Sequence, residues 1–170
     1  MKKVVLFVMI FFFCFASCRN SVERKINQIK PGKKELADMN SYLVQKDREK
    51  IQSYVERKRI PAKETQTGLW YYIINEGKGK YFGQNDKVTF NYMCSLLDGT
   101  ECYNSLKLGP KECVIGKSDL EPGLNEGLRM LRPGGEAIFI LPPFLAYGLL
   151  GDSKSIPSRS IIIYHITISK

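Results

Sequence analysis

The chain has 170 residues, of which 44% are hydrophobic and 25% are charged. This length and composition suit one globular domain of ordinary size with additional segments, and they leave no need for a second hydrophobic core. The formal net charge of +9 at pH 7 fits three interpretations: a nucleic-acid partner, an anionic lipid surface, or a solvated surface rich in Lys and Arg.

The first residues predict export. A basic Met1–Lys3 precedes the apolar run Val4–Phe15, which is too short for a comfortable membrane span and favours a cleaved signal. The sequence Phe-Ala-Ser-Cys that ends at Cys18 resembles the bacterial lipobox, whose cysteine is lipidated after residues 1–17 are removed. In the alternative, a plain secretory signal, Cys18 is incidental; the small residues before it favour the lipoprotein.

The predicted lipid would anchor the chain to a membrane, because two or more acyl chains give stable attachment. Arg19 is not the acidic residue that retains some Gram-negative lipoproteins at the inner membrane, so this resemblance suggests the outer membrane, facing the periplasm. Export argues against nucleic acid as a partner. Signal removal takes Lys2 and Lys3 away, and the remaining basic charge favours a solvated surface or loose contact with lipid headgroups.

Residues 18–32 predict a tether with little fixed structure, and residues 33–61 predict a helical segment. Apolar residues recur near helical spacing in this segment, namely Leu36, Met39, Leu43, Val44, Ile51, Tyr54 and Val55. Asn40-Ser41 offers a cap for a second helix, so one helix or two fit the pattern, and Pro61 ends it. Two roles fit the segment: packing on its own domain, or mediating a dimer.

The next part of the chain predicts strands. Residues 68–75 form an apolar run that covers both faces of a strand, and the basic, glycine-rich turn at 76–83 lacks the spacing of a phosphate-binding loop. Residues 87–97 alternate, with one apolar face made of Val88, Phe90, Tyr92, Cys94 and Leu96. Asp98-Gly99 then predicts a hairpin turn.

Three cysteines fall in the body of the chain: Cys94, Cys102 and Cys113. A two-residue turn at Asp98-Gly99 places Ser95 opposite Cys102, so Cys94 should point to the other face of the hairpin. Without a bulge that pair cannot form a disulfide, and all three cysteines are interpreted as small buried apolar residues. No spacing indicates a zinc or redox site, so neither a metal nor a cofactor is expected.

The second half predicts a strand at 101–105, an irregular stretch to Gly109, and a strand at 112–115. A helix should begin near Pro122 and end at 132–135, with one side made of Leu120, Leu124, Leu128 and Leu131. Strands at 137–141 and 161–166 flank a loop rich in Pro, Gly and aromatic residues. That loop either forms the wall of a pocket or caps its own core. The fold class is α+β.

The order of these pieces resembles the FKBP-type peptidyl-prolyl cis-trans isomerases over residues 68–169. The resemblance rests on the Asp-Gly hairpin, the Leu-Glu-Pro-Gly-Leu-Asn-Glu-Gly-Leu helix, the Pro-Gly-Gly turn, Ala-Tyr-Gly, Ile-Pro and the closing apolar strand. It implies an antiparallel sheet wrapped around one short helix in an isomerase domain at 62–170. The lipobox, the preceding helix and the segment at 67–71 are similar, more loosely, to lipoproteins associated with gliding motility.

The resemblance implies that the chain rotates X-Pro bonds of exported, proline-containing polypeptides and assists folding in the cell envelope. Tyr147 would donate its hydroxyl to a substrate carbonyl, and the backbone N–H of Glu121 would be a second donor. The family's pocket maps onto further residues of this chain, with Leu120 and Leu124 as floor and back, Tyr92 and Tyr164 as walls, Ile156 at the rim, and Cys102 and Tyr103 beside them. His165 is interpreted as an ordinary sheet residue facing away from this site.

Some positions depart from the family's pattern. Cys102-Tyr103 replaces a Phe-Asp pair, Leu124 replaces a tryptophan, and Lys111 replaces a phenylalanine. Glu121 replaces Ile or Val and puts a charge at the mouth of the pocket. Two hypotheses follow: a membrane-anchored prolyl isomerase, or a non-catalytic binding module or chaperone on the same fold that holds an envelope partner.

Overall fold

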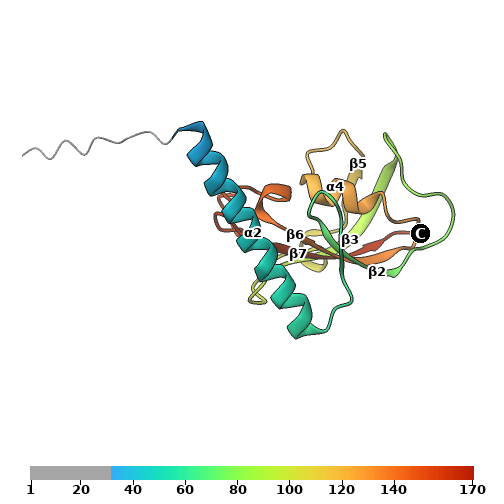
Figure 1. The fold of residues 1–170 in the computed structure, drawn as a ribbon. Coiled ribbons are helices and arrows are strands. Elements are labelled where there is room, and N and C mark those ends of the chain that lie inside the picture. Colours follow the sequence, from blue (N-terminus) through green and yellow to red (C-terminus); the bar gives the residue numbers. More distant parts are fainter. Residues whose placement is uncertain (1–31) are drawn as a thin grey trace, which may run out of the picture. The chain divides into compact units, whose positions relative to one another are not determined.

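An antiparallel sheet of seven strands organises residues 32–170, the part of the chain that this computed structural model describes (Figure 1). The strands are β1 (Lys63–Glu64), β2 (Trp70–Asn75), β3 (Lys87–Leu96), β4 (Glu101–Asn104), β5 (Lys111–Val114), β6 (Glu136–Leu141) and β7 (Ile162–Ile168). They follow the order β1-β2-β6-β7-β3-β4, and β5 pairs with β3. The predicted signal at 1–17, Cys18 and the tether up to residue 31 lie outside the described residues.

Four helical elements accompany the sheet: α2 (Lys33–Lys58), α3 (Ser105–Leu108), α4 (Pro122–Leu128) and the 3-10 turn η1 (Pro143–Leu145). The expected α+β class, with an antiparallel sheet, one short helix and an N-terminal helix, is therefore confirmed. In the described part of the chain, none of the helices is both long and apolar enough to cross a membrane.

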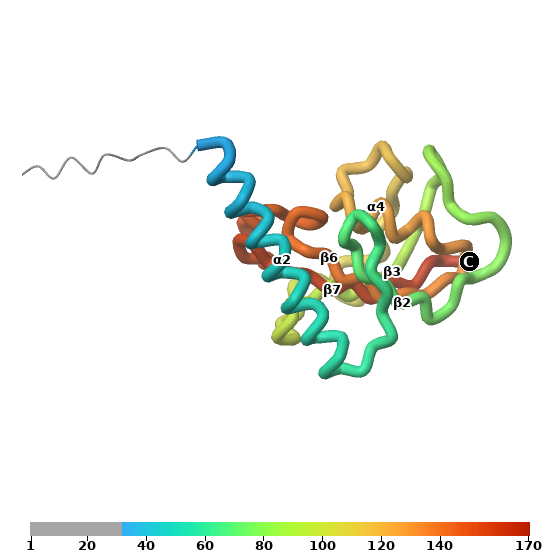
Figure 2. Tube along the Cα trace, viewed as in Figure 1, coloured from blue at the N-terminus to red at the C-terminus, as the bar shows by residue number. Residues whose placement is uncertain are grey.

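The strand β7 separates two hydrophobic clusters because its side chains alternate between two faces. Tyr164 and Ile166 point into the main core, which also holds Leu124 and Leu128 of α4. Ile163 belongs to a second cluster with residues of α2. Figure 1 shows α4 and α2 on either side of the sheet, and Figure 2 shows the connection at 76–86 at the end of the sheet remote from α2.

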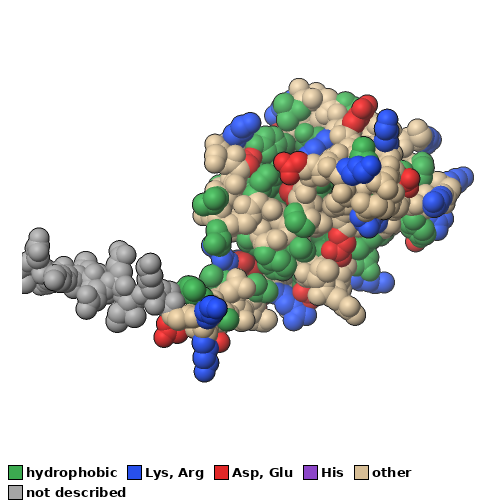
Figure 3. All heavy atoms as spheres, turned by 90° about the horizontal axis from the view of Figure 1, so that it is seen from above, with side chains coloured by type: hydrophobic (Ala, Val, Ile, Leu, Met, Phe, Trp, Pro, Cys, Tyr) green, Lys and Arg blue, Asp and Glu red, His purple; other side chains and the backbone are tan. Residues whose placement is uncertain are grey.

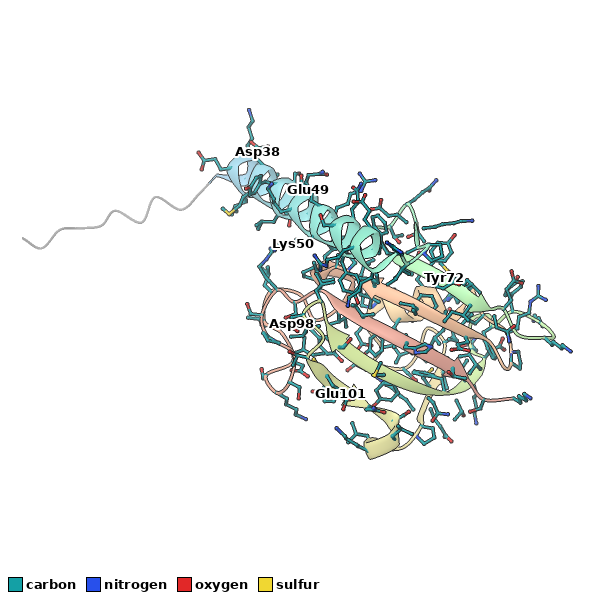
Figure 4. The ribbon with its side chains drawn as sticks, turned by 90° about the horizontal axis from the view of Figure 1, so that it is seen from below. Asp38, Glu49, Lys50, Tyr72, Asp98 and Glu101 are labelled. Atoms are coloured by element: carbon teal, nitrogen blue, oxygen red, sulfur yellow. The ribbon has the colours of Figure 1, made fainter. Side chains whose placement is uncertain are left out.

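The helix α2 packs on its own domain, which is one of the two roles that the sequence left open. It is one helix from Lys33 to Lys58, so Asn40-Ser41 does not start a second one. Ile51 is fully buried in the second cluster, and the buried carboxylate of Asp47 lies 2.7 Å from Nη2 of Arg159. Figure 4 shows Asp38, Glu49 and Lys50 along the length of this helix.

The helix α4 begins at Pro122, as expected, but ends at Leu128, before the predicted end at 132–135. Its leucines Leu124 and Leu128 are fully buried. A Cβ atom added at Gly127 would come within 2.8 Å of the Phe139 ring, so only glycine lets the helix approach the sheet this closely. The predicted irregular stretch after β4 is instead the short helix α3, which is capped by a hydrogen bond from the Leu106 N–H to the Asn104 side chain.

The predicted register of the β3–β4 hairpin was wrong. Ser95 pairs with Glu101 and Cys94 with Tyr103, so a bulge places one extra residue, Cys102, in β4. Cys102 therefore packs against the same core that holds Cys94, although alternation had assigned the two to opposite faces. All three thiols are free, and Cys102 is half-buried where full burial was expected. Asp98 and Glu101 mark this hairpin in Figure 4.

The buried side of α2 predicts a stability effect. Replacing Ile51 by Ala should lower the free energy of unfolding by about 2–5 kcal/mol, because the change leaves a cavity between helix and sheet. Urea denaturation of the full chain measures this. Ser53→Ala, on the exposed side of the same helix, is the control and should change the value by less than about 0.5 kcal/mol. Equal effects of the two variants would contradict the burial of Ile51 between helix and sheet.

Candidate active site

Three elements meet at the carboxylate of Glu121. This residue precedes α4 and caps no N–H of the helix with its side chain. Its Oε1 instead accepts hydrogen bonds from the hydroxyls of Tyr147, in the loop after η1, and Tyr164, in β7; the O–O distance to Tyr164 is 2.7 Å. The sequence predicted that the Glu121 side chain lies at the mouth of the pocket. The structure instead buries it, with 7% of the residue exposed.

The other oxygen of the Glu121 carboxylate, Oε2, is buried and accepts no hydrogen bond from any group in the described part of the chain. Buried polar atoms in native proteins usually have a partner; the other two atoms of this kind in the described part of the chain are Asn125 Oδ1 and Arg132 Nε.

Aromatic side chains form one wall of the site. The rings of Tyr92 and Tyr164 lie edge to face, with centroids 6.2 Å apart, and Phe90 extends the row with a centroid distance of 6.0 Å to Tyr92. Tyr92 and Tyr147 are half-buried and pack against the main core, whereas Tyr164 is 3% exposed. The structure therefore brings the three predicted tyrosines together around the carboxylate.

The aliphatic residues of the predicted pocket also lie in this region. Leu124 is fully buried, and Leu120 is partly buried against the main core. Ile156, expected at the rim, is instead 3% exposed and belongs to the main core itself. Cys102 is partly buried and packs against the same cluster.

Sequence analysis missed Asp152. The hydroxyl of Tyr103 in β4 donates to Oδ2 of Asp152, and the other carboxylate oxygen accepts the N–H groups of Lys154 and Ile156 at 2.9 and 2.8 Å. The loop thus places a carboxylate beside Tyr103, the residue that stands where the family's pattern has Asp. Asp before Ser-Lys-Ser is a signal for a side-chain-capped turn, but its partner Tyr103 is distant in sequence.

Burial and the nearby carboxylates keep several groups of this site neutral. Burial raises the pKa of Tyr164 far above its ordinary value, and the charge of Glu121 adds to this effect. Burial and the hydrogen bond to Glu121 raise the pKa of Tyr147 in the same direction. Burial, followed by the proximity of Cys102, raises the pKa of the Cys94 thiol to about 12. None of these groups is suited to acid–base catalysis near neutral pH.

Two hydrogen-bond donors border this cluster. The hydroxyl of Tyr147 is one, and the backbone N–H of Glu121 is the other; no hydrogen bond within residues 32–170 uses that N–H.

His165 is not part of the site, because its Nε2 lies 2.7 Å from Glu136 on the face of β7 opposite to Tyr164. The expectation that His165 is an ordinary sheet residue is confirmed.

The buried thiol predicts a pH dependence. In the unfolded chain Cys94 loses its proton near pH 9, whereas in the folded chain it keeps the proton up to about pH 12. Its contribution to stability is therefore complete below pH 9 and is lost as the pH rises toward 12, at up to about 1.4 kcal/mol per pH unit. Urea denaturation at pH 8, 9 and 10 should show this slope, and Cys94→Ala should show a shallower one. Identical slopes would contradict the assignment.

The comparisons with known proteins agree with this geometry. The family model described as FKBP-type peptidyl-prolyl cis-trans isomerase matches residues 79–169, more than half of the chain. The chain is 35% identical over 111 residues to the FKBP-type peptidyl-prolyl cis-trans isomerase FkpA of Buchnera aphidicola, covering 65% of this chain and 43% of that relative. It is 32% identical over 123 residues to FkpA of Escherichia coli, covering 72% of this chain and 44% of that relative.

Solved structures show the same fold. The crystal structure of FkpA from Escherichia coli superimposes with a TM-score of 0.62 at 26% identity, covering 83% of this chain and 73% of that one. The N-terminal domain of FKBP42 from Arabidopsis thaliana gives a TM-score of 0.58 at 22% identity, covering 63% of this chain and 88% of that one, which supports the fold alone. The chain spans less than half the length of the curated relatives it matches. It belongs to the FKBP-type peptidyl-prolyl cis-trans isomerase family.

Proposed function

We propose that this protein catalyses the cis-trans isomerisation of X-Pro bonds in polypeptides exported to the cell envelope, and so assists their folding. One observation carries the proposal: two hydrogen-bond donors, the Tyr147 hydroxyl and the Glu121 N–H, border a cluster of buried aromatic and aliphatic side chains. Uncatalysed isomerisation takes tens of seconds or longer, which is slow enough to limit folding.

The chemistry needs no catalytic acid or base. Rotation about the X-Pro bond requires the loss of amide resonance, against a barrier of ~20 kcal/mol. A dry pocket disfavours the planar, polar ground state relative to the twisted transition state, and a few donors hold the substrate carbonyls. Tyr147, Tyr164 and Tyr92 supply such surroundings here.

A second function has an observation in its favour. The hydroxyl of Tyr147 already donates to Glu121, so it is occupied in the free protein and must leave the carboxylate before it binds a substrate carbonyl. This arrangement suits a non-catalytic module or chaperone that holds an envelope partner on the same apolar surface.

Catalysis in a proline-limited refolding assay separates the two functions. The full chain should accelerate the slow refolding phase, and Tyr147→Phe should lower the rate constant about tenfold, since one hydrogen bond to the transition state is lost. Tyr72→Phe is the matched control, because Tyr72 on β2 lies outside both hydrophobic clusters and should keep full activity (Figure 4). A folded parent that produces no acceleration would favour the binding module.

We further propose that the protein is held at the outer membrane, facing the periplasm, by a lipid on Cys18. The support is the sequence of the export signal and the lipobox before this cysteine. Figure 3 shows acidic side chains interspersed among the basic ones on the visible face, which suits a solvated surface better than a nucleic-acid site. A role in motility machinery rests on the looser resemblance to gliding-motility lipoproteins.

Labelling in cells with a palmitate analogue tests the anchor. Cys18→Ala should abolish the label and release the protein from the membrane fraction, because the cysteine is the acceptor of the lipid. Cys14→Ala changes a cysteine inside the apolar run of the signal and should keep the label. Label that persists in Cys18→Ala would contradict the proposed anchor.

A further inference from the structure

The carboxylate of Glu121 lies in the centre of the proposed site, and only one of its two oxygens has hydrogen-bond partners. Its Oε1 accepts the hydroxyls of Tyr147 and Tyr164, whereas Oε2 accepts nothing from residues 32–170. Only 7% of the surface of Glu121 is exposed. A buried carboxylate oxygen without a partner destabilises the folded chain, so its presence at a binding site points to a donor that arrives with a ligand.

The surroundings of Glu121 favour a cation over a neutral donor. Asp152 supplies a second carboxylate to the same cluster through Tyr103, and neither acid forms an ion pair within the described residues. The site therefore carries uncompensated negative charge in a chain with a net charge of +9.

The charge of these acids acts across the cluster. Burial raises the pKa of the Cys94 thiol to about 12, with the proximity of Cys102 next, and the charges of Glu121 and Asp152 contribute in the same direction. A side chain that combines positive charge with N–H donors would satisfy both the free oxygen and the local charge.

The carboxylate of Glu121 belongs to the same residue as one of the two donors proposed to bind the substrate. In the proposed function, the N–H of Glu121 and the hydroxyl of Tyr147 bind substrate carbonyls, so the Glu121 side chain extends from a residue that itself holds the substrate. A basic substrate side chain that binds the carboxylate must displace the atoms that cover Oε2. We propose that Glu121 is a specificity-determining residue that selects substrates with Lys or Arg immediately before the proline. This inference rests on the proposed function and names its substrate class.

The same contact would release the hydroxyl of Tyr147. An ammonium or guanidinium group that binds the carboxylate competes with Tyr147 for Oε1, and the hydroxyl is then free to donate to the substrate carbonyl. Substrates without a basic residue leave Tyr147 engaged with Glu121. A basic residue before the proline should therefore increase the rate constant of isomerisation as well as the affinity for the substrate.

Exchange spectroscopy by NMR on tetrapeptides of the form Ala-Xaa-Pro-Phe tests the proposal with the full chain. With Lys or Arg as Xaa, kcat/KM should exceed that of Leu by at least about tenfold, the size expected for one charge-assisted hydrogen bond. Glu121→Gln keeps an acceptor for both tyrosines but removes the charge, and should bring the ratio close to one. Glu126→Gln is the matched control, because Glu126 of α4 bonds to Thr67 instead of the cluster, and should keep the ratio.

A second measurement uses the unsubstituted protein, so its result does not depend on whether the Glu121→Gln variant folds. Acetyl-lysine as Xaa keeps the length of Lys but lacks its charge, so the preference should disappear; it should also weaken as salt rises. A parent that prefers Leu to Lys, or a Lys preference that acetylation or Glu121→Gln leaves unchanged, would overturn the inference.

A further experiment distinguishes the failure of this inference from the failure of the proposed isomerase function. If no peptide is isomerised, NMR titration with Ala-Lys-Pro-Phe and Ala-Leu-Pro-Phe decides the role of Glu121. Tighter binding of the Lys peptide that is lost in Glu121→Gln supports the selection of basic residues while the isomerase is rejected. Equal binding of both peptides overturns the selection as well.

Discussion

The strand β7 is hydrogen-bonded on both edges, and its first residues are buried on both faces. The positions of the other elements follow from this constraint. It pairs with β6 and β3, while Tyr164 and Ile166 enter the core under α4 and Ile163 enters the cluster under α2. A shift of one residue would exchange the two faces and place His165 in the main core. The register is therefore fixed by packing, and with it the direction of the Tyr164 hydroxyl.

That hydroxyl connects the core to the site. Tyr164 donates to Glu121, which stands where the chain enters α4, and Tyr147 brings the loop after η1 to the same carboxylate. One acid thus ties a strand, a helix and a loop together. A buried charge with an unfilled oxygen is a poor way to stabilise a fold, and an apolar residue of similar size would often serve better. Its presence is explained more simply by a ligand than by packing.

Much of the site could be predicted because its parts are local in sequence. The alternation along β3 placed Tyr92 on the inner face, and the order of short motifs pointed to Tyr147 and Tyr164; the structure brings all three together. The partnership of Tyr103 with Asp152 could not be predicted, since nothing in either segment specifies the other. The hairpin register failed for a related reason: a bulge at Cys102 changes the pairing by one residue and leaves the polarity pattern almost unchanged.

The sequence by itself determined most of the elements, their order and the family, because periodicity, turn residues and motif spacing are properties of neighbouring residues. The short elements β1 and α3 were not among them. Only the tertiary structure decided where the Glu121 side chain goes. A residue before a helix can turn its carboxylate to solvent, to the helix N–H groups or inward. Here two tyrosines from distant parts of the chain supply donors on the inner side, and their hydrogen bonds hold the acid in the core.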